Sequence, residues 1–317
     1  MISTGNNPWE KMHLSSVRRV DRDTPFNYFW LLDENGRYGL LIKFNSLSLE
    51  DEIVNQLKGI TIISRLKEDG STDIFYILNN NSEWEMFVAL CQDLLTTSDS
   101  STNERELFLV LMSRLKRWQI FLSQNSTREL SERKQMGLFA ELLILRDYVI
   151  PKFGTSNSIT SWTGPQFDKQ DFSFDGFFIE VKSFVSSKSA IVQISSLHQL
   201  LNTIKPLYMT VIGLSRNENG RSIVDLIFDI SALTIKVASN CNEVFESKLA
   251  EYGYIHGFTI PPFYAFNCDN IQAFTIVDSF PRITPATVAN QIISAEYKID
   301  LTRCQEFRID INTIFSK

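Results

Sequence analysis

The chain has 317 residues, of which 44% are hydrophobic, so it can bury a sizeable core in one large domain or in two ordinary ones. Its formal net charge of -6 argues against wholesale wrapping of nucleic acid by a basic surface and leaves room for a local basic site. The four cysteines are far apart, the start lacks a secretory leader, and no apolar run approaches the roughly 20 residues that span a bilayer, so we expect reduced, buried thiols in a soluble, cytoplasmic protein.

The first part of the chain predicts antiparallel β structure. Residues 26–44 contain two apolar runs around an Asn-Gly pair, which is the strongest short signal for a hairpin. Residues 59–78 contain a second pair of runs, with Asp-Gly in the turn. Ser82 and Glu85 have the spacing of a capping box and predict the start of a helix. A polar stretch at 96–103 follows.

This polar stretch sets the expected domain boundary. We expect a β-rich subdomain with a closing helix in residues 1–98 and a second domain, with a C-terminal extension, in residues 99–317. In the second domain we expect, in order, helices at 104–122 and at 131–149, the latter stopping at Pro151, a hairpin at 171–183, a strand at 190–195, a helix from about 197, and strands near 207–214 and 222–230. This order predicts a mixed α/β sheet flanked by helices.

The hairpin carries the chemistry. Its sequence, DFSFDGFFIEVKS, has Asp175-Gly176 at the centre, which favours a two-residue type I′ turn and would place Asp171 directly across from Glu180. Because side chains alternate between the faces of a strand, Lys182 shares the face of these two acids. The other face is apolar and consists of Phe172, Phe174, Phe177, Ile179 and Val181.

Two carboxylates that face each other across a strand pair repel unless something compensates their charge. A Mg²⁺ ion would do so, and Lys182 could then orient the attacking water or help to deprotonate it during hydrolysis of a phosphodiester. The alternative is a solvated strand face, on which Lys182 merely neutralises the two acids. The residues by themselves leave both interpretations open.

Two neighbouring segments bear on this choice. Gly137, Ala140 and Glu141 share one stripe of the helix at 131–149, so close docking could bring Glu141 to the same cluster, although an acid on a polar helix face needs no such role. Gln199 follows Ser196 at capping-box spacing, which favours a structural role over a catalytic one. None of the three histidines has a second His or Cys at metal-ligand spacing, so zinc chemistry is not expected.

Six ordered blocks carry a resemblance. They are GLFAEL at 137–142, WTGP at 162–165, DF at 171–172, IEVKS at 179–183, VQISSLHQL at 192–200 and FPRIT at 280–284. Together they resemble a family of PD-(D/E)XK proteins encoded in bacterial phage-defence and restriction islands. The resemblance covers about residues 100–317 and implies a restriction-endonuclease-like α/β core, with a metal site at the end of the hairpin.

The resemblance also implies roles for single residues. By position, Asp171 and Glu180 look like metal carboxylates and Lys182 like the catalytic lysine, and Glu141 looks like the acid on the preceding helix. The expected metal ligands are then Glu141, Asp171, Glu180 and Val181, and the supporting residues Ser183, Gln199 and Arg282. Arg282 could contact phosphate or hold the C-terminal segment in place. The chain departs from the family in having Ala140 for a usual glycine and Gln170 for the proline of PD.

We therefore expect a Mg²⁺-dependent DNA endonuclease of a bacterial defence or restriction system, with Mn²⁺ as a substitute ion. Its expected partners are DNA, other proteins of a defence operon and a second copy of the chain. The alternative is a catalytically silent module that binds DNA or scaffolds a multi-protein defence complex, and the acidic composition favours it. A nuclease acting on RNA is a third option.

Overall fold

The chain folds into two compact units. The structure, a computed structural model, describes residues 7–46, 56–123, 129–166, 170–201 and 205–315. Unit 1 comprises Met1–Arg128 with Gly253–Thr259, and unit 2 comprises Glu129–Tyr252 with Ile260–Lys317. The boundary that we expect between residues 98 and 99 lies inside unit 1, because the helices on either side of it pack against each other.

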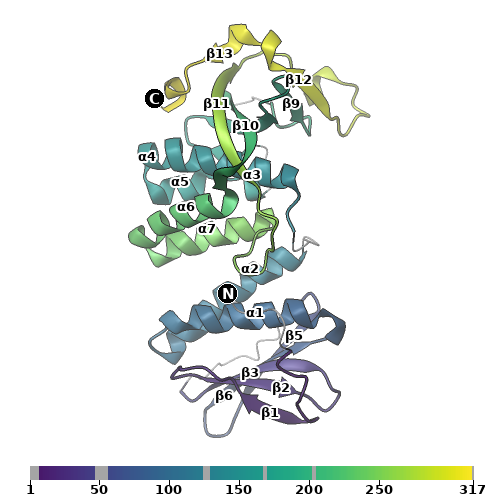
Figure 1. The fold of residues 1–317 in the computed structure, drawn as a ribbon, viewed down its shortest axis with the longest axis vertical. Coiled ribbons are helices and arrows are strands. Elements are labelled where there is room, and N and C mark those ends of the chain that lie inside the picture. Colours follow the sequence, from purple (N-terminus) through teal and green to yellow (C-terminus); the bar gives the residue numbers. More distant parts are fainter. Residues whose placement is uncertain (1–6, 47–55, 124–128, 167–169, 202–204, 316–317) are drawn as a thin grey trace. The chain divides into compact units, whose positions relative to one another are not determined.

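Unit 1 contains a six-stranded antiparallel sheet in the order β1-β2-β3-β6-β5-β4 (Figure 1). Its strands are β1 Ser16–Arg19, β2 Asn27–Leu32, β3 Tyr38–Phe44, β4 Gln56–Leu57, β5 Ile60–Leu66 and β6 Thr72–Leu78. Both predicted hairpins are confirmed, since β2 pairs with β3 and β5 pairs with β6. Gly36 and Gly70 in their turns have φ of 72° and 80°, a left-handed conformation that glycine adopts without strain.

Two long helices follow the sheet in unit 1. They are α1, Trp84–Thr97, and α2, Glu104–Ser123. Asp93 of α1 accepts a hydrogen bond from Trp118 Nε1 of α2 at 2.8 Å and pairs with Arg114 at 2.9 Å. The capping box predicted from Ser82 is wrong. Asn80 instead accepts from Ser82 N and begins a 3₁₀ turn at Asn81–Glu83, from which α1 continues.

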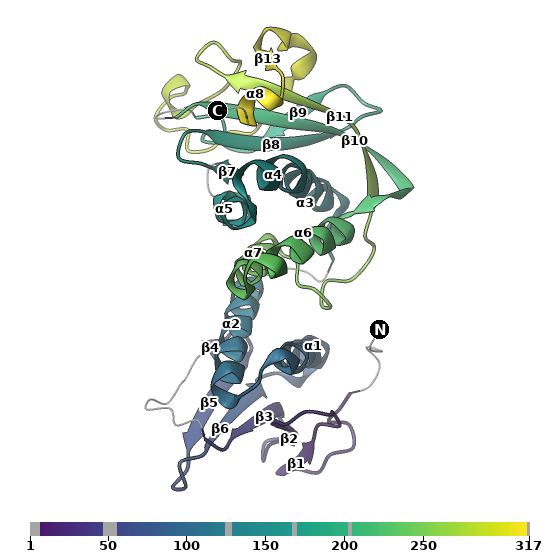
Figure 2. The ribbon, with the colours of Figure 1, turned by 90° about the vertical axis from the view of Figure 1, so that its left-hand side faces the viewer.

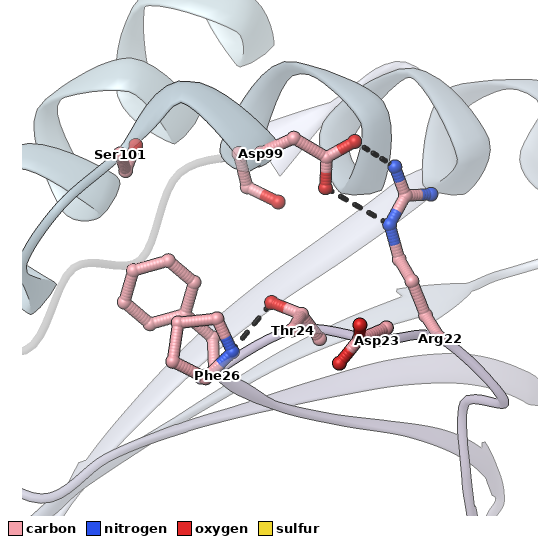
Figure 3. A pocket seen from close by; sticks show the side chains of 8 residues that line it. Arg22, Asp23, Thr24, Phe26, Asp99 and Ser101 are labelled. Carbon is pink, nitrogen blue, oxygen red and sulfur yellow. Dashed lines mark hydrogen bonds and ion pairs between the residues drawn. The ribbon is translucent and has the colours of Figure 1, made fainter.

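A pocket of about 370 Å³ lies in unit 1 where the connection from β1 to β2 approaches the connection from α1 to α2 (Figure 3). Arg22 and Asp99 form an ion pair across it. Ser101 Oγ is buried there and has no hydrogen-bond partner among the described residues. No pattern in the sequence marks this pocket.

Unit 2 is built on a five-stranded mixed sheet in the order β13-β11-β10-β8-β7. Strands β8 and β10 are parallel and the other pairs are antiparallel. The strands are β7 Phe172–Ser173, β8 Phe178–Val185, β10 Leu207–Ser222, β11 Ala265–Ile276 and β13 Arg308–Ile309. Strands β9, Ile191–Ile194, and β12, Tyr297–Asp300, form a separate antiparallel pair. The expected mixed α/β class is thereby confirmed.

Helices flank this sheet, and Figure 2 shows α3, α4 and α5 along one of its faces. The helices are α3 Glu132–Ile144, α4 Ile150–Phe153, α5 Thr155–Ser161, α6 Ile223–Val237, α7 Ser239–Tyr252 and α8 Asn312–Phe315. The predicted helix stop at Pro151 is wrong. A π-helical turn at Leu145–Val149 joins α3 to α4, and its wider backbone accommodates a proline that lacks an N–H.

Two other predicted elements of unit 2 are wrong. Residues 222–230, predicted as a strand, begin α6, because Ser222 and Asp225 form a capping box and the buried apolar residues follow a helical period. The helix predicted from about 197 is a series of turns through residue 200, and its continuation at 202–204 lies outside the described residues.

The face of the sheet that carries Phe184, Met209 and Phe274 packs into a buried apolar cluster with residues of β9 and β12. This cluster borders the strand face that carries Glu180 and Lys182. No helix in the described ranges is long and apolar enough to cross a bilayer. All four cysteines lie in the described ranges as free thiols, and the expectation of burial holds for three of them but is wrong for the exposed Cys268.

Candidate functional site

The predicted hairpin register is confirmed. Phe172 pairs with Ile179 and Ser173 with Phe178, and Phe174 N donates to Phe177 O at 3.0 Å. Asp171, one residue before β7, therefore extends the same register toward Glu180. The type I′ turn is wrong, because neither residue of the Asp-Gly pair has a positive φ. The register nevertheless holds because it depends on the pairing on both sides of the turn.

The strand face of Glu180 and Lys182 is not solvated. Glu180 is 1% exposed, and Phe178 and Phe184, which alternate with it along β8, pack against the buried cluster. Lys182 Nζ forms an ion pair with Glu180 Oε1. Glu180 Oε2 is buried without a hydrogen-bond partner among the described residues. The strand face is therefore largely buried rather than wet, although Lys182 does neutralise Glu180 in this ion pair, as the alternative predicted.

Asp171 is anchored across the hairpin through one carboxylate oxygen. Its Oδ2 accepts a hydrogen bond from Val181 N at 2.6 Å. Its backbone carbonyl accepts from Thr163 N at 2.8 Å and from Gly164 N at 3.0 Å. These bonds fix the side chain next to Glu180 and leave Oδ1 directed to the segment of residues 162–165.

Gly164 lies between two of the acids. A Cβ atom placed on Gly164 would be 2.6 Å from Glu141 Oε2 and 2.9 Å from Asp171 Oδ1. Both oxygens thus approach one point from different elements, Glu141 from α3 and Asp171 from the hairpin. Glu141 is 7% exposed, so the interpretation of it as an acid on a polar helix face is wrong.

The segment before Gly164 holds Glu141 in place. Trp162 is fully buried, and its Nε1 donates to Glu141 Oε2 at 2.8 Å. Lys248 of α7, 5% exposed, donates to the carbonyls of Ile159 and Thr160 at 2.8 and 2.9 Å and also to that of Trp162. Lys248 thus satisfies carbonyls that the end of α5 leaves without helical partners. We infer that it positions the indole that donates to Glu141.

Burial raises the pKa values of all three acids, and repulsion by neighbouring acids adds to this rise at Glu180 and Glu141. Burial, with the charge of Asp171, raises the pKa of Glu180 to about 8. Burial and the charges of Asp171 and Glu180 raise the pKa of Glu141 well above its usual range. Burial raises the pKa of Asp171, against the opposing effects of Lys182 and of the Val181 N–H. Burial alone would lower the pKa of Lys182, but the surrounding acids, Glu180 first, raise it.

These shifts predict a pH-dependent stability when a chelator removes free metal ions. The folded-state pKa of Glu180, about 8, lies above the ordinary value of 4.5, so between these values the folded chain holds a proton that the unfolded chain has released. The free energy of unfolding should therefore fall as pH rises through this window, with a slope of up to about 1.4 kcal/mol per pH unit. Denaturant titrations across the window measure the slope.

Glu180→Gln provides the control for this prediction, because it removes the titrating group and one charge that acts on Glu141. The slope should become shallower in this variant. An unchanged slope would assign the pH dependence to groups other than Glu180.

The donor atoms fit a hard divalent cation. Carboxylate oxygens of Glu141, Asp171 and Glu180 and the backbone carbonyl of Val181 are the ligand type of Mg²⁺ and Mn²⁺, and Glu180 Oε2 is buried without a partner. Among the described residues no three His, Cys, Asp or Glu side chains already stand at metal-ligand spacing. The acids meet in pairs instead, and burial, which raises the pKa of each, disfavours their charged forms unless positive charge is added.

The three predicted supporting residues differ in their surroundings. Ser183 pairs with Ile212 of β10 and is half-buried. Gln199 Oε1 accepts from Ser195 N at 2.8 Å, so its contact is structural as expected, but it supports a turn and not the predicted helix cap with Ser196. Arg282 donates to Leu200 O at 2.8 Å and pairs with Asp278 at 2.9 Å. These bonds favour the structural alternative for Arg282.

Sequence reasoning missed several residues of the site. Trp162 and Gly164 belong to the WTGP block, whose position in the chain was visible but whose contacts were not. Nothing in the sequence around Lys248 distinguishes it from an exposed helix lysine. Tyr252 also escaped notice. A Cβ on Gly137 would lie 2.8 Å from the hydroxyl oxygen of Tyr252. The predicted small-residue stripe of α3 therefore packs closely against the end of α7.

A comparison with family models gives a match that covers most of the chain. Residues 6–302 match the model described as "Putative PD-(D/E)XK family member, (DUF4420)". Comparisons with curated proteins and with solved structures found no match. The matched range includes every acid and the lysine described above. It also extends into unit 1, beyond the region of about residues 100–317 covered by the resemblance in the sequence.

Proposed function

The chain belongs to this PD-(D/E)XK family, and on this premise we propose that it is a divalent-metal-dependent DNA endonuclease of a bacterial defence or restriction system. The observation that carries the proposal is the convergence of Glu141 and Asp171 at Gly164, next to a buried Glu180 whose second oxygen has no partner among the described residues. Structural ion pairs normally satisfy such groups, so an unsatisfied acid among other acids supports a site for a cation.

The residues have distinct roles in this proposal. Asp171, Glu180 and the Val181 carbonyl would hold the cation, and Glu141 would add a carboxylate from α3. When bound, the cation supplies positive charge to the scissile phosphate and lowers the pKa of a coordinated water. Lys182 is a cation at neutral pH, because its pKa is raised by the neighbouring acids despite its burial. It therefore orients the attacking water or stabilises developing negative charge rather than accepting a proton.

The test is incubation of the purified protein with methylated and unmethylated plasmid in Mg²⁺, in Mn²⁺ or in EDTA. Nicking or linearisation that requires the metal ion supports the proposal. A parallel incubation with RNA of the same sequence distinguishes the two nucleic acids as substrates. Absence of cleavage on every substrate would contradict the proposed activity.

The net charge of -6 favours a second candidate, a catalytically silent module that binds DNA or scaffolds a defence complex. It differs from the first in one measurement. Such a module would bind DNA or a partner protein equally well in EDTA and in Mg²⁺ and would leave the plasmid intact.

Gly164→Ala is expected to reduce metal-dependent cleavage by roughly ten- to a hundredfold. The added methyl group would meet Glu141 Oε2 at 2.6 Å and Asp171 Oδ1 at 2.9 Å, so the carboxylates must move apart. Cleavage rates of purified variants, with thermal unfolding to confirm that each is folded, measure the effect.

Gly176→Ala is the matched control, because a Cβ on Gly176 meets nothing within 4 Å and its φ is not positive. It should cut at nearly the wild-type rate. Equal activity of the two alanine variants would show that the approach of the acids at Gly164 has no part in the reaction.

A further inference from the structure

A second pocket lies in unit 2, beside the strand pair β9–β12. Its volume is about 540 Å³, within the range of roughly 300–1,000 Å³ that is usual for small-molecule sites. The residues that line it include Pro281, Arg282, Tyr297, Lys298, Arg303 and Phe307. None of these residues has a role in the proposed metal site, and only Arg282 was predicted to support it.

The pocket lies on the face of the sheet to which Glu180 and Lys182 belong. Phe178 and Phe184 alternate with these residues on β8 and pack into the apolar cluster described above. Phe307 is a member of the same cluster and also lines the pocket, as do Ile299 and Cys304. One set of buried side chains therefore supports both the catalytic lysine and the pocket.

Hydrogen bonds also connect the pocket to the acids. Arg282, in the pocket wall, donates to Leu200 O at 2.8 Å. Gln170 donates to the carbonyls of His198 and Gln199, the two preceding residues of the same turn, at 3.3 and 3.4 Å. Gln170 directly precedes Asp171. The turn at 197–200 thus links the pocket wall to the carboxylate that is proposed to bind the cation.

The chemistry of the lining suits a nucleotide. Tyr297 presents a half-buried aromatic ring, and Pro281 and Phe307 add apolar surface, which together provide a stacking surface for a base. Lys298 and Arg303 are exposed cations at which a phosphate can bind. Two acids, Asp300 and Glu306, also line the pocket. Asp300 accepts hydrogen bonds from Thr302 and lies 3.5 Å from Arg303, so Asp300 and Arg303 partly neutralise each other. Lys298 is a further cation of the lining.

The charge of Lys182 is close enough to Tyr297, in the pocket wall, to affect the pKa of the Tyr297 hydroxyl slightly. Burial raises the pKa of Tyr297, and the bond to Ile283 and the charges of Arg282 and Lys182 oppose that rise. The Tyr297 hydroxyl is already engaged, because it accepts from Ile283 N at 3.1 Å. Its ring is thereby held in place, packs against the apolar cluster and also lines the pocket.

We propose that this pocket receives one unpaired nucleotide of the strand that is cut, with the base against Tyr297 and the phosphate at Lys298 and Arg303. The inference rests on the proposed nuclease function and specifies its substrate as DNA with a nucleotide that is displaced from the duplex or can be displaced. The cost of displacing a nucleotide is lowest where it is already unpaired. The protein should therefore prefer such sites.

Fluorescence anisotropy in EDTA tests this preference without cleavage. The probes are a labelled duplex with one unpaired nucleotide and the fully paired duplex of the same sequence. We expect the wild-type chain to bind the first about tenfold more tightly, as stacking of one base on an aromatic ring allows. Tyr297→Leu should abolish the preference, whereas Tyr297→Phe, which keeps the ring, should retain it.

Lys298→Ala and Arg303→Ala should weaken binding to the unpaired probe. Lys236→Ala removes one positive charge at an exposed position on α6 outside the pocket and is the matched control, which should bind this probe like the wild type. Thermal unfolding confirms that each variant is folded. A folded Tyr297→Leu variant with an undiminished preference would overturn the inference, and so would equal binding of both probes by the wild type.

Plasmid cleavage by the same preparations separates this inference from the proposed function. Cleavage without any preference for the unpaired probe overturns the pocket assignment alone. A pocket-dependent preference without metal-dependent cleavage supports the pocket and overturns the nuclease. If the protein neither binds nor cleaves DNA, both the pocket assignment and the nuclease proposal are overturned.

Discussion

Asp171→Asn is expected to reduce metal-dependent cleavage by about a thousandfold, because several kcal/mol of charge stabilisation is lost with the carboxylate. The fold should persist. An asparagine carbonyl can still accept the hydrogen bond that Val181 N donates to Asp171 Oδ2 at 2.6 Å. The amide group would then face Gly164 and Glu141, where it cannot bind a cation. Cleavage rates and Mn²⁺ affinity by calorimetry should fall together.

Asp175→Asn is the control for this variant. Asp175 is exposed in the hairpin turn, at the end far from Lys182, and asparagine is also a good turn residue. It should cut like the wild type. Asp168, the third nearby aspartate, lies outside the described residues, and the hairpin register predicts that Asp168→Asn is nearly silent. An inactive Asp175→Asn beside an active Asp171→Asn would contradict the register argument for the site.

The register could be predicted because it depends on few, local facts. Apolar residues alternate on both sides of Asp175-Gly176, and a slip by one residue would take Phe172 and Ile179, which are fully buried, out of their apolar face and put the acids there. The turn type was predicted from a dipeptide preference and was wrong. Burial of the apolar face therefore determines the pairing more strongly than the turn does.

The alternative of a wet strand face could not be excluded from the sequence, because alternation in β8 is the same whether the second face meets water or protein. What decides it is the packing of Phe178 and Phe184 against the cluster that contains β9 and β12 residues distant in the chain. Long-range packing of this kind leaves no local pattern. The same holds for Lys248, whose partners lie 86 to 89 residues away.

The error at residues 222–230 has a different origin. Ser222 and Asp225 already have the spacing of a capping box, and Ile223, Ile227 and Ile230 recur at helical intervals. These residues are also rich in β-branched side chains, which are common in strands. The helix forms because its cap and its buried stripe agree, and such agreement outweighs β propensity.

Lys182→Ala should leave the chain folded and able to bind metal, yet reduce cleavage by about a thousandfold, the upper part of the usual range for a group that stabilises charge developing in the transition state. Removal of Lys182 takes away the ion-pair partner of the buried Glu180. Without metal, this carboxyl can respond by holding its proton, since burial and Asp171 have already raised its pKa to about 8. With metal present, the cation replaces the lost positive charge.

Calorimetry with Mn²⁺, thermal unfolding and plasmid cleavage separate these effects. Lys188→Ala removes the same charge from an exposed residue just beyond β8 and should cut normally. Lys182→Met, which restores apolar volume without the ammonium group, should fold at least as well as Lys182→Ala and remain inactive. Loss of metal binding in both Lys182 variants would show that the lysine organises the acids, and cleavage at the wild-type rate would remove it from the reaction.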